Sequence, residues 1–187
     1  MVLGVTLAAS IAAGFAWSRA NDDGSDLDAS LDTPGTYVEP SPGIPTAPQL
    51  AGDPLPDVAV TDLDGNEVRF ADLIGQPMVV NIWFSTCVPC KTEMPAFGQV
   101  QGELGDDVRF IGLNYSESAD VASSFASDHG ARYEQLLDAE GDFTSALQIG
   151  NFPATLFVDA TGRIVELHQG ALDADTLTAT IRKDLLP

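Results

Sequence analysis

Two cysteines, Cys87 and Cys90, constrain this chain most strongly, because they lie where a buried strand meets a long helix. Residues 78–84 (MVVNIWF) are apolar enough for a buried strand, and a helix is predicted from about Val88 to Leu104. Positions three residues apart are neighbours on a helical turn, so the two sulfurs are close enough to form a small disulfide ring. The chain has no other cysteine, so these sulfurs act together.

The two sulfurs are expected to differ in reactivity. Cys87 lies at the helix N-terminus, where unpaired backbone N–H groups and the helix dipole favour a thiolate. Cys90 lies one turn further along and is shielded. We therefore expect Cys87 to attack a substrate disulfide and Cys90 to resolve the mixed disulfide. Pro89 is tolerated because the first turn does not need its N–H.

A C-x-x-C pair is also one half of a four-ligand zinc site. The second half is missing here, since the two histidines, His129 and His168, are not paired in sequence. We therefore predict no bound metal, and no cofactor other than the redox-active disulfide Cys87–Cys90.

The 187-residue chain carries 28 acidic and 8 basic side chains, for a net charge of −20. This charge argues against a nucleic-acid partner and against docking of the protein body on an anionic membrane. The same acidity also fits solubility in salty surroundings or a general compositional bias, so it bears on environment and not on chemistry.

The chain divides into three predicted parts. Residues 1–20 begin with eighteen uncharged positions, which as a helix would span about 27 Å, close to the ~30 Å hydrocarbon core of a bilayer. This segment is predicted to be a membrane anchor or a cleavable signal. Residues 21–52 contain six acids, no bases and five prolines, which predicts a disordered linker. Residues 53–187 have the pattern of a compact domain.

Strands and helices alternate along this domain, which predicts an α/β fold. Glycine-containing turns at 64–66 and 161–162 predict two β-hairpins. The expected strands are 58–61, 68–70, 78–84, 108–114, 155–158 and 164–168. The expected helices are 88–104, one capped by Ser118 and ending at Gly130, a short one at 142–148, and 174–186.

Six short motifs occur along residues 53–187: Pro54-Leu55-Pro56-Asp57, Leu63-Asp64-Gly65, Asn81-Ile82-Trp83, Cys87-Val88-Pro89-Cys90, Glu93-Met94-Pro95 and Phe152-Pro153-Ala154-Thr155. Through these motifs the domain resembles the thioredoxin superfamily, specifically the TlpA/ResA/DsbE-like group of membrane-tethered thiol–disulfide oxidoreductases. The resemblance implies a thioredoxin-like fold, with a central mixed sheet flanked by helices and an N-terminal β-hairpin extension.

The resemblance also implies a substrate-binding surface beside Cys87. Pro153 matches the family's cis-proline, which would leave the backbone of Phe152 free to pair with an incoming peptide. Thr86 stands where many relatives carry a tryptophan before the first cysteine. Trp83 and Thr86 join Phe152 and Pro153 as substrate-binding candidates, although Trp83 is most simply a core residue of the strand beneath the site.

Glu93 matches an acidic residue that this group carries three positions after the second cysteine. One helical turn separates the two, so Glu93 can lie beside Cys90 and take its proton when Cys90 becomes a nucleophile. The alternative is an acid favoured in the early turns of a helix by the dipole alone. Asn81 occupies the place of a buried aspartate in cytoplasmic thioredoxins, so that proton carrier is absent.

Together these features predict an extracytoplasmic thiol–disulfide oxidoreductase, anchored by its N-terminal helix or secreted after cleavage of that segment. The resemblance implies a reductase of exported protein disulfides, including those of cytochrome c maturation, fed by a membrane thiol-electron donor. Membrane contact is expected only through the N-terminal segment. The partners would be protein thiols and disulfides.

Two other functions share some of these sequence features. A peroxiredoxin-like thiol peroxidase shares the lead-in from Pro54 to Phe70, but its peroxidatic cysteine follows a Pro-x-x-x-Thr-x-x-Cys arrangement that neither cysteine here has. A Sco-like copper-binding assembly protein uses cysteines one residue further apart plus a distant histidine. His168 could take the role of that histidine, but the spacing of the cysteines argues against this function.

Overall fold

The computed structural model of the chain describes residues 48–186. The predicted anchor or signal at 1–20 lies outside the described residues, as does the predicted linker up to residue 47. No helix within residues 48–186 combines the length and apolar character needed to cross a bilayer.

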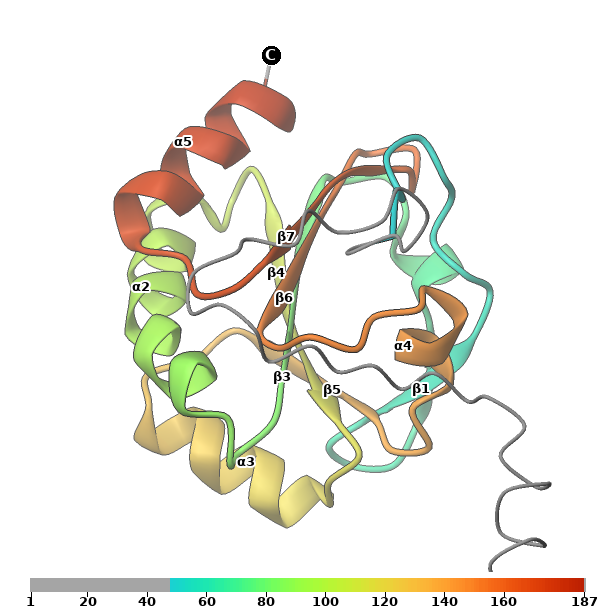
Figure 1. Ribbon diagram of the computed structural model, residues 1–187, viewed down its shortest axis with the longest axis vertical. Helices are drawn as coiled ribbons and strands as arrows, with labels where there is room; N and C mark the ends of the chain where they lie inside the picture. The colour runs from blue at the N-terminus through green and yellow to red at the C-terminus, as the bar shows by residue number, and fades with distance from the viewer. Residues whose placement is uncertain (1–47, 187) are drawn as a thin grey trace, which may run out of the picture. The chain divides into compact units, whose positions relative to one another are not determined.

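A seven-stranded mixed sheet forms the centre of the domain, in the order β2-β1-β5-β4-β3-β6-β7 (Figure 1). The neighbours β3, β4 and β5 are parallel, and every other pairing is antiparallel. The strands are β1 Ala59–Asp62, β2 Glu67–Arg69, β3 Met78–Trp83, β4 Arg109–Tyr115, β5 Glu134–Asp138, β6 Ala154–Val158 and β7 Ile164–Gln169. The predicted thioredoxin-like α/β fold is confirmed.

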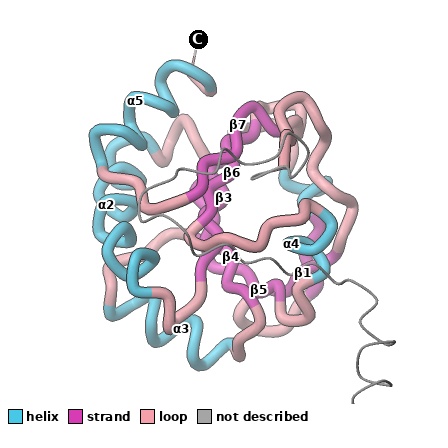
Figure 2. The backbone as a smooth tube through the Cα atoms, in the orientation of Figure 1, coloured by secondary structure: helices cyan, strands magenta, loops and turns pink. Residues whose placement is uncertain are grey.

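Helices cover both faces of this sheet, as the tube view also shows (Figure 2). One face carries α2 (Val88–Leu104), α3 (Ala119–Asp128) and α5 (Ala174–Asp184), and the other carries the 3-10 helix η1 (Phe70–Leu73) and α4 (Asp142–Ala146). Each face has its own apolar core. The larger core lies under α2, α3 and α5 and includes both cysteines.

Strand β3 lies between β4 and β6, and all six of its residues are buried. Its side chains alternate, as those of any strand do: Val79 and Trp83 enter one core, and Val80 and Ile82 enter the other. A strand buried on both faces reads as a continuous apolar run, which is the pattern in the sequence. Because β3 has a strand on each side, the segment that follows it leaves the sheet between β4 and β6.

Two hairpins close where the glycine-containing turns predicted them. In the first, β1 pairs with β2, and the Asp62 carboxylate accepts hydrogen bonds from the backbone N–H groups of Asp64 and Asn66. Gly65 has φ 86°, a left-handed conformation that glycine adopts without steric cost. In the second hairpin, β6 pairs with β7.

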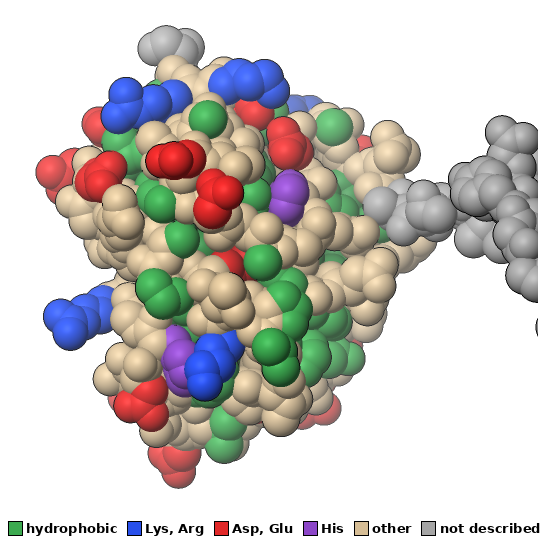
Figure 3. Space-filling model, turned by 60° about the vertical axis from the view of Figure 1, so that its left-hand side comes forward, with side chains coloured by type: hydrophobic (Ala, Val, Ile, Leu, Met, Phe, Trp, Pro, Cys, Tyr) green, Lys and Arg blue, Asp and Glu red, His purple; other side chains and the backbone are tan. Residues whose placement is uncertain are grey.

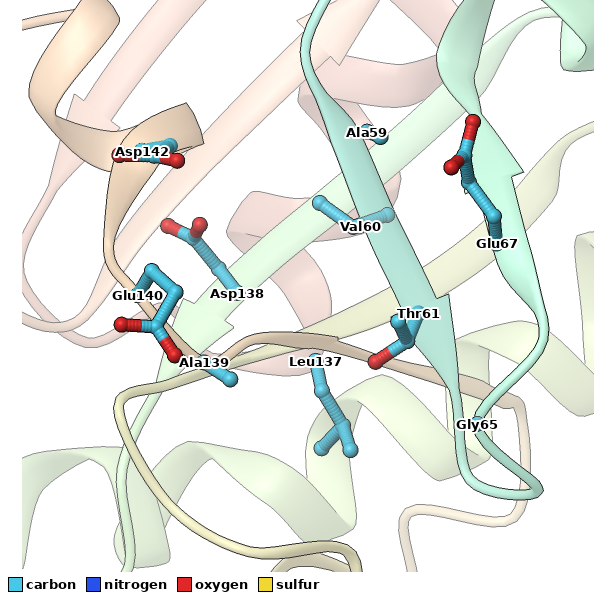
Figure 4. Close-up of a pocket in the computed structure, with 10 residues that line it drawn as sticks. All are labelled: Ala59, Val60, Thr61, Gly65, Glu67, Leu137, Asp138, Ala139, Glu140 and Asp142. Carbon is cyan, nitrogen blue, oxygen red and sulfur yellow. The ribbon is translucent and has the colours of Figure 1, made fainter.

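The start of α4 is capped from a neighbouring strand. The residue before the helix is Gly141, which has no side chain to offer. The Asp138 carboxylate at the end of β5 instead accepts hydrogen bonds from the backbone N–H groups of Phe143 and Thr144, both at 3.0 Å. Figure 4 shows this carboxylate pointing towards the helix. The cap fixes α4 against the sheet.

Candidate active site

Cys87 and Cys90 form a disulfide at the start of α2, with their Cα atoms 5.3 Å apart. Cys87 is the N-cap residue of the helix, and its sulfur accepts a 3.2 Å hydrogen bond from the backbone N–H of Cys90. Cys87 keeps 6% of its surface exposed, whereas Cys90 has none. Pro89 lies within the first turn, as predicted. Only Cys87 can therefore be approached from solvent.

A short turn joins β3 to this helix. The backbone N–H of Cys87 donates to the carbonyl of Phe84 at 3.1 Å, which closes the turn. Within it, Ser85 donates to the Glu117 carboxylate through its backbone N–H, at 2.8 Å, and through its hydroxyl. Asn114 donates to the same carboxylate at 2.7 Å. An acid from a different loop thus holds the segment that carries Cys87.

Glu93 lies one turn after Cys90 and is almost wholly buried, with 2% of its surface exposed. One carboxylate oxygen accepts a 2.7 Å hydrogen bond from Asn81 Nδ2, and the other accepts a 3.0 Å bond from the backbone N–H of Leu172. Burial raises the pKa of Glu93 to about 7, and the two hydrogen bonds act in the opposite direction. The side chain can therefore hold or release a proton near neutral pH.

The loop between β7 and α5 contacts both halves of the site. Its Leu172 N–H binds Glu93, and its Gly170 N–H donates to the carbonyl of Pro153 at 2.8 Å. The peptide bond between Phe152 and Pro153 is cis, in agreement with the match to the family's cis-proline. One loop therefore joins the buried acid on α2 to the segment before β6.

Phe152 belongs to a cluster of three half-buried aromatic side chains. The centroid of its ring lies 5.3 Å from that of Phe84, in an edge-to-face arrangement, and 5.1 Å from that of Tyr115. Phe84 precedes the turn to Cys87, so the cluster joins this turn to the segment that carries Pro153. Such a surface can receive an apolar part of a substrate.

The other two substrate-binding candidates differ sharply in exposure. Thr86 is exposed beside Cys87. Trp83 has no exposed surface, and its indole stacks on Phe125 of α3 with ring centroids 5.4 Å apart. Trp83 has no surface that could touch a substrate, so its position is that of a core residue.

Four residues of this network were not singled out from the sequence: Asn114, Glu117, Tyr133 and Leu172. Tyr133 reaches the network through its hydroxyl, 3.5 Å from Asn81 Oδ1. Glu117 could have been suspected, because it follows β4, the parallel neighbour of β3, and the carboxyl ends of adjacent parallel strands meet at one edge. Leu172 contributes only its backbone, which no sequence pattern marks.

A shallow groove of about 440 Å³ lies over α3 beside Ser85. Val121 and Phe125 line it with two acids, Asp120 and Asp128. Figure 3 shows the face covered by α2, α3 and α5, where hydrophobic side chains are exposed among acidic ones. This groove is the hollow that adjoins the turn before Cys87.

A separate hollow of about 300 Å³ lies between the β1–β2 hairpin and the loop from β5 to α4 (Figure 4). Four acids line it: Glu67, Asp138, Glu140 and Asp142. It shares no residue with the disulfide site. In residues 48–186 no group of three or more potential metal ligands comes together.

The sequence of this chain is similar to those of known proteins. Residues 50–184 match the Redoxin family. The thiol-disulfide oxidoreductase ResA of Bacillus thuringiensis is 26% identical over 133 residues, which cover 71% of this chain and 77% of the relative. The thioredoxin-like protein YneN of Bacillus subtilis is 27% identical over 124 residues, covering 65% and 72%.

Solved structures of other proteins have a similar fold. A secreted Mycobacterium tuberculosis disulfide oxidoreductase described as homologous to E. coli DsbE superposes with a TM-score of 0.62 and 25% identity, covering 68% of this chain and 96% of its own. A putative thiol:disulfide interchange protein DsbE from Chlorobium tepidum, 22% identical with a TM-score of 0.63, supports the fold; the match covers 71% of this chain and 94% of that one.

Proposed function

This chain belongs to the Redoxin family and is a thiol–disulfide oxidoreductase, and from that premise we propose that its Cys87–Cys90 pair reduces disulfides in exported proteins. The observation that carries the two cysteine roles in this proposal is the unequal burial of the two sulfurs at the N-terminus of α2. One sulfur can meet a substrate, and the other can be reached only from within the protein.

The first step is attack by the Cys87 thiolate on one sulfur of the substrate disulfide. A bond forms between Cys87 and that sulfur, the substrate S–S bond breaks, and the other substrate sulfur leaves as a thiolate that takes a proton from water. The N–H groups at the start of α2 stabilise the attacking thiolate. Thr86, Phe152 and Pro153 form the surface on which the substrate chain rests.

The second step is attack by the Cys90 thiolate on the Cys87 sulfur. The bond between Cys87 and the substrate breaks, the second substrate sulfur leaves as a thiolate that takes a proton from water, and the Cys87–Cys90 disulfide forms. Two electrons have then passed from the protein to the substrate. Cys90 must first lose its proton inside an apolar core, where a free thiolate is costly. Glu93, one turn away and with a pKa of about 7, accepts that proton.

The place of action follows from the resemblance and from the N-terminal sequence. One similar protein is described as secreted, and the uncharged segment at 1–18 suits an anchor or an export signal. Outside the cytoplasm the oxidised pair needs a fresh supply of electrons, which we assign to a membrane thiol donor. Apocytochromes c awaiting haem attachment are one class of exported substrate that such a reductase serves.

Trapping the mixed disulfide tests the two cysteine roles. A reduced Cys90→Ser variant should accumulate a covalent adduct with a disulfide-bonded protein substrate, visible by mass spectrometry and reversed by dithiothreitol. Cys87→Ser should form no adduct and show no turnover. Turnover by Cys87→Ser at the wild-type rate would contradict the mechanism.

The reduction potential of the pair tests the direction of electron flow. Equilibration in dithiothreitol redox buffers should give a value near that of thioredoxins and glutaredoxins, about −270 to −220 mV. A value near about −120 mV is that of a strong disulfide donor. That result would exclude the reductase and cytochrome assignments while leaving the two cysteine roles intact.

A further inference from the structure

We propose that Glu117 is a positioning residue for Cys87: by holding Ser85, its carboxylate fixes the turn that keeps the Cys87 sulfur at the N-terminus of α2. The inference rests on the proposed role of Cys87 as the attacking sulfur. Glu117 itself touches neither substrate nor sulfur in this proposal, and it acts only through Ser85.

Three donors converge on this one carboxylate. Oε2 accepts from the backbone N–H of Ser85 at 2.8 Å and from Asn114 Nδ2 at 2.7 Å, and Oε1 accepts from the Ser85 hydroxyl. Ser85 is the second residue of the turn that the Cys87 N–H closes on the Phe84 carbonyl. A rigid bond at this position therefore limits movement of the residue two places further on.

The fold brings these residues together from 32 positions apart. Strands β3 and β4 are parallel neighbours with Trp83 opposite Asn114, so the segments after them leave the sheet side by side. Between Asn114 and Glu117, Ser116 has φ 57°, a left-handed conformation that residues other than glycine rarely adopt. Its N–H is held by the Asp138 carbonyl at 3.0 Å. The unusual backbone turns the chain so that Glu117 faces Ser85.

The position of the sulfur matters because helix N-terminal N–H groups stabilise an anion only over a short range. In this structure the Cys90 N–H already points at the Cys87 sulfur, 3.2 Å away. If the turn were free to move, the sulfur would spend less time against these donors and the thiolate would be less favoured. A carboxylate held near the site has the opposite electrostatic effect, since it repels a thiolate.

These opposed effects allow positioning to be separated from charge. Glu117→Gln removes the charge but can keep all three hydrogen bonds: its oxygen can accept from the Ser85 N–H and Asn114, while its nitrogen donates to the Ser85 hydroxyl, which can act as an acceptor. Glu117→Ala removes both the charge and the bonds. Ser85→Ala removes only the hydroxyl contact.

The measurement is the rate of alkylation of Cys87 by iodoacetamide as a function of pH, in the full chain with Cys90→Ser so that one thiol remains. We expect Glu117→Ala to slow alkylation at pH 7 about fivefold and to move its midpoint up by about one pH unit. Glu117→Gln should stay within about twofold of the parent or react faster. Ser85→Ala, with the milder change, should shift the midpoint in the same direction as Glu117→Ala.

Glu134→Ala is the matched control. Glu134 is also a half-buried acid with two hydrogen bonds, here to Arg109, but it lies at the opposite end of the parallel strands. It should leave the alkylation profile unchanged. Lys91, Glu93, Asp120 and Asp128, which are charged groups on the helices around this turn, remain the same in every variant.

Two results would overturn the proposal. Faster alkylation in both Glu117 variants would mean that the carboxylate acts by charge alone. An unchanged pH profile in Glu117→Ala and Ser85→Ala, with a lower melting temperature, would mean a structural role only. Neither result affects the role of Cys87, which is tested separately by turnover of Cys87→Ser.

Discussion

Asn81 Nδ2 donates a 2.7 Å hydrogen bond to Glu93 Oε1, and both side chains are buried. The pair joins the middle of β3 to the first turns of α2. Asn81 is neutral, so Glu93 is the only titratable side chain of the pair. The pKa of Glu93 depends on its burial and on hydrogen-bond donors such as Asn81. The contact therefore lowers the pKa of a carboxyl one helical turn from Cys90, against the larger opposite effect of burial.

Glu93 should make the protein less stable as the pH rises. Its pKa is about 7 in the folded protein and 4.5 for an unburied glutamate, so between these values the folded state binds the extra proton and stability falls as the pH increases. From pH 5 to pH 8 the free energy of unfolding should drop by about 2 to 3 kcal/mol from this group. Urea unfolding of the oxidised protein at both pH values measures it.

The Glu93→Gln variant isolates this contribution. The amide cannot titrate, so its difference in unfolding free energy between pH 5 and pH 8 should be smaller than that of the wild type by about 2 to 3 kcal/mol. The comparison uses only the change with pH, so a constant cost from facing an amide N–H towards Asn81 or Leu172 cancels. Equal pH dependence in the two proteins would mean that Glu93 is ionised throughout this range.

Removing the Asn81 donor should raise the pKa of Glu93 above about 7, because the hydrogen bond favours the charged form. In Asn81→Ala the carboxyl titration, followed by ¹³C NMR, should move up by roughly one pH unit. Resolution of the mixed disulfide should shift to higher pH with it, if Glu93 is the proton acceptor. Thr155→Val is a matched control, since Thr155 lies opposite Asn81 in β6 and its hydroxyl has no hydrogen-bond partner among residues 48–186.

Much of the fold could be predicted because its strongest signals are local. Helix α2 begins and ends where expected, since the cysteine pair marks its start and Gly105 caps its end. Strand β5 was not predicted, because Glu134 and Gln135 break its apolar pattern. The Gln135 side-chain NH2 group donates to the carbonyls of Ala131 and Tyr133, an arrangement that exists only after the chain has folded. Phe70 was predicted in a strand but begins η1.

The site also has a part that the sequence predicts and a part that it does not. Cys87, Cys90 and Glu93 lie on one helix, so their spacing predicts that they come together. The partner of Glu93 in the last loop, Leu172, is 79 positions away, and that of Ser85, Glu117, is 32 positions away. Such contacts depend on strand order, which the sequence pattern of single elements does not specify.

Substitution of the buried Asp138 should lower the stability of the protein strongly. Its buried carboxylate accepts from two backbone N–H groups and from the Thr144 hydroxyl. Asp138→Ala would leave these donors unpaired, at a cost of about 2 to 4 kcal/mol in the free energy of unfolding. Asp142→Ala, at an exposed acid in the first turn of α4, the helix that Asp138 caps, should cost no more than about 0.5 to 1 kcal/mol. Denaturant unfolding at pH 7 compares them, and equal losses would contradict the capping role.

Phe152 should matter for protein substrates and much less for small ones. Its half-buried ring lies against Phe84 and Tyr115, next to Pro153. A polypeptide that binds beside Cys87 would cover this ring, whereas a small disulfide needs only the sulfur. Phe152→Ala should therefore reduce kcat/KM for a disulfide-bonded protein about tenfold, as expected for loss of about 1.4 kcal/mol of aromatic contact. The rate with a small aromatic disulfide should stay within about twofold.

Ile74→Ala provides the comparison for Phe152→Ala. Ile74 is an exposed apolar side chain, 48% accessible, and it lies near Gly162 in the turn at the far end of β6 from Pro153. Its loss should change neither rate. If Phe152→Ala slowed both substrates equally, the ring would be acting on Cys87 itself through the turn at Phe84. If neither rate changed, the substrate would approach Cys87 from another side, and the groove over α3 would be the surface to vary next.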